Sequence, residues 1–94
     1  MEILAPMEEK FPEQYEIVAG LGFVYYLKSD YPKAVEYLTR AMLLRPADTV
    51  LLNALGESFI KVGDKERAVE ALERSLSMNP EQEDAKKLLA SITP

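Results

Sequence analysis

Two adjacent stretches of 34 residues decide the fold. Residues 15–48 read YEIVAGLGFVYYLKSDYPKAVEYLTRAMLLRPAD, and residues 49–82 read TVLLNALGESFIKVGDKERAVEALERSLSMNPEQ. Aligned without a gap, they are identical at nine positions, whereas ordinary amino-acid usage gives about two or three identities by chance. The identical pairs are Leu21/Leu55, Gly22/Gly56, Asp30/Asp64, Ala34/Ala68, Val35/Val69, Glu36/Glu70, Leu38/Leu72, Arg40/Arg74 and Pro46/Pro80. The chain therefore carries an internal duplication.

The first unit is predicted to form two helices joined by a tight turn. Pro12 suits the first turn of a helix that runs to about Lys28, because its fixed φ is already helical. Ser29–Asp30 forms the turn, and Asp30 is expected to cap a second helix that ends near Arg45–Pro46.

The second unit repeats this pattern. Asp48 is expected to cap a helix that ends at Val62, and Gly63 supplies a left-handed residue after it. Asp64 then caps the partner helix, which Asn79–Pro80 closes.

A last helix is predicted from about Pro80 to Ser91. Asn79 and Gln82 have the spacing of a capping box. The apolar stripe of this helix consists of Ala85, Leu88, Leu89 and Ile92. Because no strand pattern competes anywhere, we expect an all-α fold of about five helices.

The identical residues of the two units are expected to serve packing. Gly22 and Gly56 permit close approach of the paired helices, and we expect Ala34 and Ala68 to lie across that contact. The large residues Tyr25, Phe59, Leu38 and Leu72 fill the space that remains.

This arrangement of small and large residues resembles the tetratricopeptide repeat family. The family's unit has a small residue eighth, an aromatic residue eleventh, alanine twentieth, a large apolar residue twenty-fourth, alanine or serine twenty-seventh and proline thirty-second. The two units hold Gly22, Tyr25, Ala34, Leu38, Ala41 and Pro46, then Gly56, Phe59, Ala68, Leu72, Ser75 and Pro80. The resemblance implies a right-handed α-solenoid of stacked helix-turn-helix repeats over residues 15–82.

We divide the chain into four parts: an N-terminal arm or remnant of an earlier repeat (1–14), two repeat units (15–48 and 49–82), and a C-terminal capping helix with its tail (83–94). Pro6 and Pro12 interrupt the arm, so we expect at most a short broken helix or an extended segment there.

The apolar surface of the predicted first helix is expected to be buried against another segment. From Ile17 to Leu27 it carries no charged residue, and a helix that is apolar all round must be buried all round. Three coverings are open: the arm folds back over it, two copies pair through it, or the chain belongs to a longer array.

In the resembling family, first-helix positions two, five, nine, twelve and thirteen line a concave groove that holds a peptide. Carried over by position, the groove residues are Glu16, Ala19, Phe23, Tyr26, Leu27, Val50, Asn53, Glu57, Ile60 and Lys61, with Lys87 added from the last helix. This groove is apolar and aromatic at one end and mixed at the other, which suits a ligand with apolar anchors.

Some relatives in that family hold acidic C-terminal tails with a clamp of lysine, asparagine and arginine. The corresponding positions here hold Ala19, Phe23, Ala54, Asp84 and Leu88. Since the clamp is missing and the net charge is −5, we expect no recognition of a free carboxylate tail.

Composition excludes several function classes. The acidic balance, with a pI near 4.7, disfavours nucleic acid. The chain contains no histidine and no cysteine, which removes zinc sites of the usual kind and catalytic triads. The stretch Ile17–Leu27 is too short for a membrane span. The sequence leaves the compartment undecided, and we favour the cytoplasm.

Three local motifs also lack their chemical context. Gly20–Gly22 begins a dinucleotide fingerprint but has Tyr25 at the third glycine position, and Gly56–Ser58 begins a nucleophile elbow with no histidine in the chain. The acidic residues Glu81, Glu83 and Asp84 suit the positive end of a helix better than a cation site.

The sequence therefore predicts a non-enzymatic module for protein–protein interaction, with no metal and no cofactor, that binds a peptide or partner segment in the groove. The alternative is a structural or self-association module, including a fragment of a longer repeat protein, that pairs through its first helix.

Overall fold

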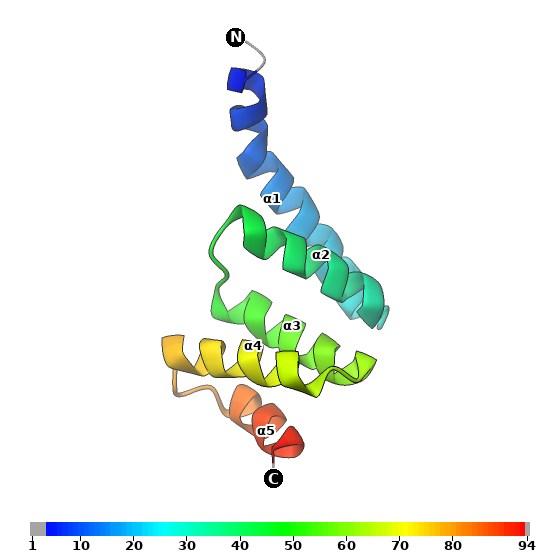
Figure 1. Cartoon of the computed structure of the whole chain (residues 1–94), viewed down its shortest axis with the longest axis vertical. Coiled ribbons are helices and arrows are strands. Elements are labelled where there is room, and N and C mark those ends of the chain that lie inside the picture. The colour runs from blue at the N-terminus through cyan, green and yellow to red at the C-terminus, as the bar shows by residue number, and fades with distance from the viewer. Residues whose placement is uncertain (1–3, 94) are drawn as a thin grey trace.

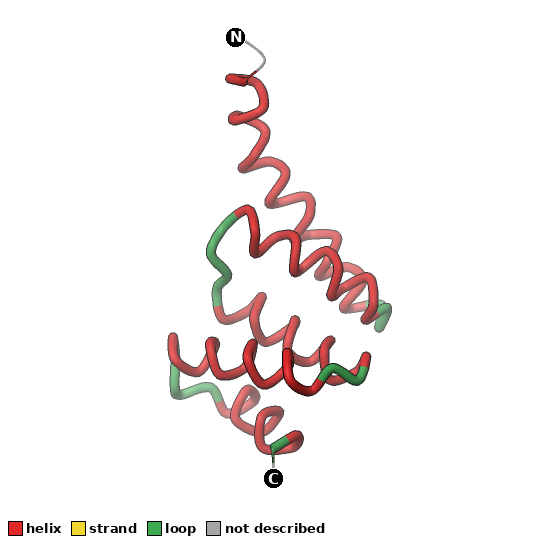
Figure 2. Tube along the Cα trace, viewed as in Figure 1, coloured by secondary structure: helices red, strands yellow, loops and turns green. Residues whose placement is uncertain are grey.

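The structure, a computed structural model, describes the backbone of residues 4–93 and the side chains of residues 15–93. The described backbone forms helices and no strand: α1 (Leu4–Leu27), α2 (Tyr31–Leu44), α3 (Thr49–Val62), α4 (Lys65–Met78) and α5 (Glu83–Ile92). Helices α1 and α2 form one hairpin, α3 and α4 form the next, and α5 packs on α4 at the C-terminal end (Figure 1). Short loops join the helices (Figure 2). The expected all-α repeat fold is confirmed.

The second hairpin has the predicted caps. Asp48 Oδ1 accepts a hydrogen bond from the Leu51 N–H at 2.9 Å, and Asp64 Oδ1 accepts one from the Arg67 N–H at 3.2 Å. Gly63 has a φ of 91°, a left-handed conformation that glycine adopts without steric cost. Both helices of this unit therefore start where the sequence predicts.

The first hairpin reaches the same geometry with different residues. Ser29 takes the left-handed place with a φ of 66°. Asp30 lies at the N-cap of α2, but its side chain makes no capping hydrogen bond, so the predicted cap is wrong in this respect. Pro32 has no amide hydrogen, which removes one of the donors that an N-cap side chain usually serves.

The start of α5 also differs from the prediction. The helix begins at Glu83 rather than near Pro80. Asn79 Oδ1 accepts a hydrogen bond from the Glu81 N–H at 3.1 Å, and Gln82 Nε2 donates to the Asn79 carbonyl at 2.9 Å. These bonds form a turn before the helix, so the capping box is not formed.

Helix α1 begins earlier than expected, at Leu4, and continues through Pro12. Residues 1–3 of the expected arm lie outside the described residues. Residues 4–14 belong to one continuous helix, so the expected short broken helix or extended segment is wrong for them, and they do not fold back. They prolong α1 beyond the end of α2 (Figure 1). One proline removes a single helical hydrogen bond, and the helix-forming residues Glu8–Lys10 precede it. Of the three coverings, folding back of the arm is therefore wrong for these residues.

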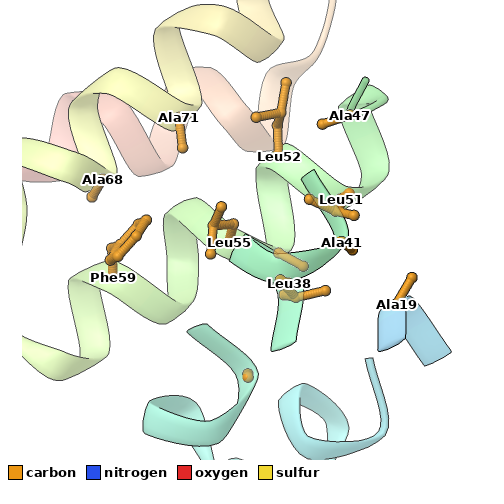
Figure 3. Packing of buried hydrophobic residues seen from close by; sticks show 12 residues of the cluster. Ala19, Leu38, Ala41, Ala47, Leu51, Leu52, Leu55, Phe59, Ala68 and Ala71 are labelled. Carbon is orange, nitrogen blue, oxygen red and sulfur yellow. The ribbon is translucent and has the colours of Figure 1, made fainter. Parts of the chain in front are cut away.

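The core lies where α2, α3 and α4 meet (Figure 3). Its largest fully buried side chains are Leu38, Leu51, Leu52 and Leu72. The glycine contact is partly different from the prediction, because the atoms nearest to a Cβ added at Gly22 belong to Leu38 and those nearest to a Cβ added at Gly56 belong to Leu72. Ala34 and Ala68 are buried as expected, but they are not the nearest neighbours of the glycines.

Candidate functional site

The predicted groove residues lie on α1, α3 and α5. Helix α3 contacts both α1 and α5, so the first helices of the two units and the terminal helix are neighbours in one row. Side chains from positions far apart in the sequence are thereby brought to one surface.

Tyr26 of α1 and Glu57 of α3 meet on this surface. The Tyr26 hydroxyl donates a hydrogen bond to Glu57 Oε1 at 2.5 Å, and the Tyr31 ring lies edge-on to Tyr26 at 6.2 Å between centroids. The hydrogen bond to Glu57, burial and the negative charge of Glu57 raise the pKa of Tyr26 to about 12. The contact holds the two first helices together and fixes the orientation of the Tyr26 ring.

A second polar contact joins α3 to the segment before α5. Asn53 Nδ2 donates a hydrogen bond to Gln82 Oε1 at 2.7 Å. Gln82 Nε2 in turn donates to the Ser75 carbonyl at 3.0 Å and lies 2.9 Å from Ser75 Oγ. Gln82 was not among the predicted site residues, because a contact across 29 residues leaves no local sequence pattern.

The predicted groove residues differ in exposure. Leu27 is 78% exposed and Val50 is 62% exposed, so both offer large apolar side chains to solvent. Ala19 is buried in the core and offers little surface to a partner. Glu16, Lys61 and Lys87 are exposed, and Phe23, Tyr26, Asn53, Glu57 and Ile60 are partly buried.

A second apolar surface lies on the outer side of α1. Ile17, Leu21 and Val24 are spaced along one helical face and are all exposed. The residues 34 positions later, Leu51, Leu55 and Ser58, are all buried, and Leu51 and Leu55 lie toward α2 (Figure 3). The exposed face of α1 therefore corresponds to the face that α3 packs against the preceding hairpin. We call Ile17, Leu21 and Val24 the outer stripe.

Two other kinds of feature are absent from the described residues. Residues 15–93 contain no group of three or more histidine, cysteine or acidic side chains arranged to hold a metal ion. No helix in the part of the chain that the structure describes is long and apolar enough to cross a membrane.

Comparison with known proteins agrees with the fold. The family model of the tetratricopeptide repeat matches residues 25–92. The peroxisomal targeting signal receptor of Saccharomyces cerevisiae is 32% identical over 65 residues, which cover 69% of this chain and 11% of the receptor. The receptor of Candida albicans is 31% identical over the same shares of the two chains. The BBSome complex member BBS4 of Bos taurus is 35% identical over 60 residues, which cover 64% of this chain and 12% of that protein. The chain spans about a tenth of the length of these curated relatives.

Proposed function

Since the chain belongs to the tetratricopeptide repeat family, we propose that this protein-interaction module binds a peptide or partner segment along the surface formed by α1, α3 and the start of α5. The ligand has apolar side chains that contact Leu27 and Val50, and polar groups that reach Asn53 and Lys61. The module performs no catalysis.

The exposure of Leu27 and Val50 is the observation that carries this proposal. Each is a large apolar side chain that lies mostly in solvent on a predicted groove position. Leu27 ends α1 and Val50 lies in the first turn of α3, so a segment that crosses this surface has an apolar side chain to contact on each helix. The Tyr26 ring, which directly precedes Leu27 in the sequence, is held in place by the hydrogen bond from its hydroxyl to Glu57. A ring whose orientation is already fixed loses little conformational entropy when a partner binds.

The names of the relatives support a partner of this kind. A targeting signal receptor recognises a signal, and a complex member assembles with other chains. Because this chain spans only about a tenth of each, we propose for it only what the two names have in common, which is binding to a protein segment. The acidic-tail clamp is replaced here by residues such as Phe23 and Asp84, so we propose an apolar rather than an acidic ligand.

The proposal is tested with peptides selected from a random displayed library on the immobilised chain. Val50→Glu and Leu27→Glu should weaken the binding of selected peptides at least about tenfold, as loss of an apolar anchor does. Leu43→Glu is the matched control, because Leu43 is 82% exposed on α2, away from the groove residues. The proposal fails if the selected peptides bind the Val50 and Leu27 variants as well as the Leu43 variant.

The outer stripe favours a second candidate function, self-association. Its three apolar side chains occupy the positions that α3 uses to pack on α2, so a helix of a second copy has a matching surface to cover. This candidate requires a mass that rises with protein concentration, and a chain that stays monomeric at high concentration contradicts it.

A further inference from the structure

A cavity of about 310 Å³ lies between α2, α3 and α4. Its lining includes the apolar residues Leu52, Leu55, Phe59 and Ala71 and the arginines Arg67 and Arg74. Most of the wall is apolar, and two arginines and one glutamate contribute charge. A cavity of roughly 150 Å³ is enough to hold benzene, so this one has room for an aromatic ring.

The equivalent place in the first repeat is already filled by a ring. Tyr37 of α2 stacks on Tyr25 of α1, with centroids 5.5 Å apart and ring planes 16° from parallel. Arg40 lies over the Tyr37 ring at 5.4 Å, and Lys33 lies over the Tyr25 ring at 5.7 Å. Two rings and two cations thus form one stacked cluster.

The second repeat keeps the residue types of this cluster except for one ring. Shifted by 34 residues, Tyr25 becomes Phe59, Lys33 becomes Arg67, Tyr37 becomes Ala71 and Arg40 becomes Arg74. All four of these second-repeat residues line the cavity. The cavity therefore lies where the first repeat places the Tyr37 ring.

The second arginine position of the cluster, Arg40 in the first repeat and Arg74 in the second, also differs in its ion pairing. Glu36 holds Arg40 with an ion pair of 3.3 Å, as its spacing of four residues leads one to expect. Glu70 and Arg74 have the same spacing, but Arg74 makes no ion pair with any described residue. Its guanidinium group is consequently available to a ring or a carboxylate from outside the chain.

We infer that this cavity receives an aromatic side chain, phenylalanine or tyrosine, from a partner protein. The ring stacks on Phe59 and lies under Arg74, as Tyr37 stacks on Tyr25 and lies under Arg40. The site is separate from the groove, because its α3 residues Leu52 and Phe59 lie on the opposite face of the helix from Val50 and Lys61.

The test uses p-cresol, which is the tyrosine side chain as a free molecule, titrated into the isotope-labelled chain. Amide chemical shifts should change in a saturable way around Phe59, Ala71 and Arg74. The ring-saturated analogue methylcyclohexanol should bind about threefold more weakly, because it offers no π face to the arginines. Absence of a saturable change at these amides, or changes centred elsewhere, overturns the inference.

Two variants that exchange the repeats sharpen the test. Ala71→Tyr supplies the missing ring from within the chain and should abolish the p-cresol response at Phe59. Tyr37→Ala should create a second response around Tyr25. If Ala71→Tyr does not fold, as judged by circular dichroism, Ala71→Leu fills the same space and should also abolish the response. An undiminished response in the folded variant contradicts the inference.

Discussion

Leu38 lies directly over Gly22, with no room between them for a side chain. A Cβ atom added at Gly22 would lie 2.6 Å from Leu38 Cδ2 and 3.1 Å from the Leu38 backbone nitrogen. The relationship recurs in the second repeat, where a Cβ at Gly56 would lie 2.8 Å from Leu72 Cδ2. The two helices of each hairpin therefore approach as closely as glycine permits, and this packing sets the row of first helices that carries the groove.

We expect Gly22→Ala to lower the free energy of unfolding by about 1–3 kcal/mol, because the methyl group overlaps Leu38. Gly20→Ala is the matched control, since a Cβ there meets nothing within 4 Å and alanine favours helix by roughly 1 kcal/mol over glycine. Urea unfolding followed by circular dichroism measures both. Equal stability of the two variants would show that the contact with Leu38 does not require glycine.

The contact between Tyr26 and Glu57 predicts a late tyrosine titration. Because the folded chain raises the Tyr26 pKa from 10.0 to about 12, the contact stabilises the fold fully below pH 10.0 and this contribution is lost as the pH rises to about 12. Tyrosinate absorbance of the chain minus that of Tyr26→Phe isolates this group. Glu57→Ala should move its midpoint down toward 10.0, and an unchanged midpoint would mean that Glu57 is not the cause.

The outer stripe predicts that the same kind of substitution has a small effect on stability in the first repeat and a large one at the equivalent position of the second. Ile17→Asp should change the free energy of unfolding by less than about 0.5 kcal/mol, since Ile17 is exposed. Leu51→Asp, 34 residues later, should lower the free energy of unfolding by on the order of 3 kcal/mol or more, because it buries a carboxylate. In sedimentation equilibrium, self-association should be lost in Ile17→Asp. Persistent association of that variant would assign the interface to another surface.

The bond between Asn53 and Gln82 predicts a measurable coupling between α3 and the start of α5. Gln82→Ala leaves the Asn53 amide without its partner and should lower the free energy of unfolding by about 1–3 kcal/mol. Asn53→Leu in the same chain should recover part of that loss, because it removes the unpaired donor. A double-mutant cycle in urea checks this, and strictly additive effects would contradict the coupling.

Signals local in the sequence predicted most of the fold. The caps at Asp48 and Asp64 and the left-handed Gly63 depend only on neighbouring residues, so short patterns identify them. The starts of α1 and α5 were misplaced because Pro12 and Asn79 permit more than one local structure. In these two cases a single residue type does not decide between a helix and a turn.

The candidate site was harder to predict from the sequence than the fold. Position within the repeat placed Tyr26 and Glu57 on one surface but did not reveal that they bond to each other. The bond between Asn53 and Gln82 and the cavity beside Ala71 depend on tertiary packing. Comparing the two repeats finds that cavity only after the stacking of Tyr25 and Tyr37 is known.

The most direct test of the central claim is to map where a library-selected peptide binds on the isotope-labelled chain by amide chemical shifts. Binding along the row of first helices predicts changes along α1, α3 and the start of α5, centred on Tyr26, Val50 and Asn53. Changes confined to α2 and α4, with those three amides unmoved, would contradict the claim that the row of first helices is the binding surface.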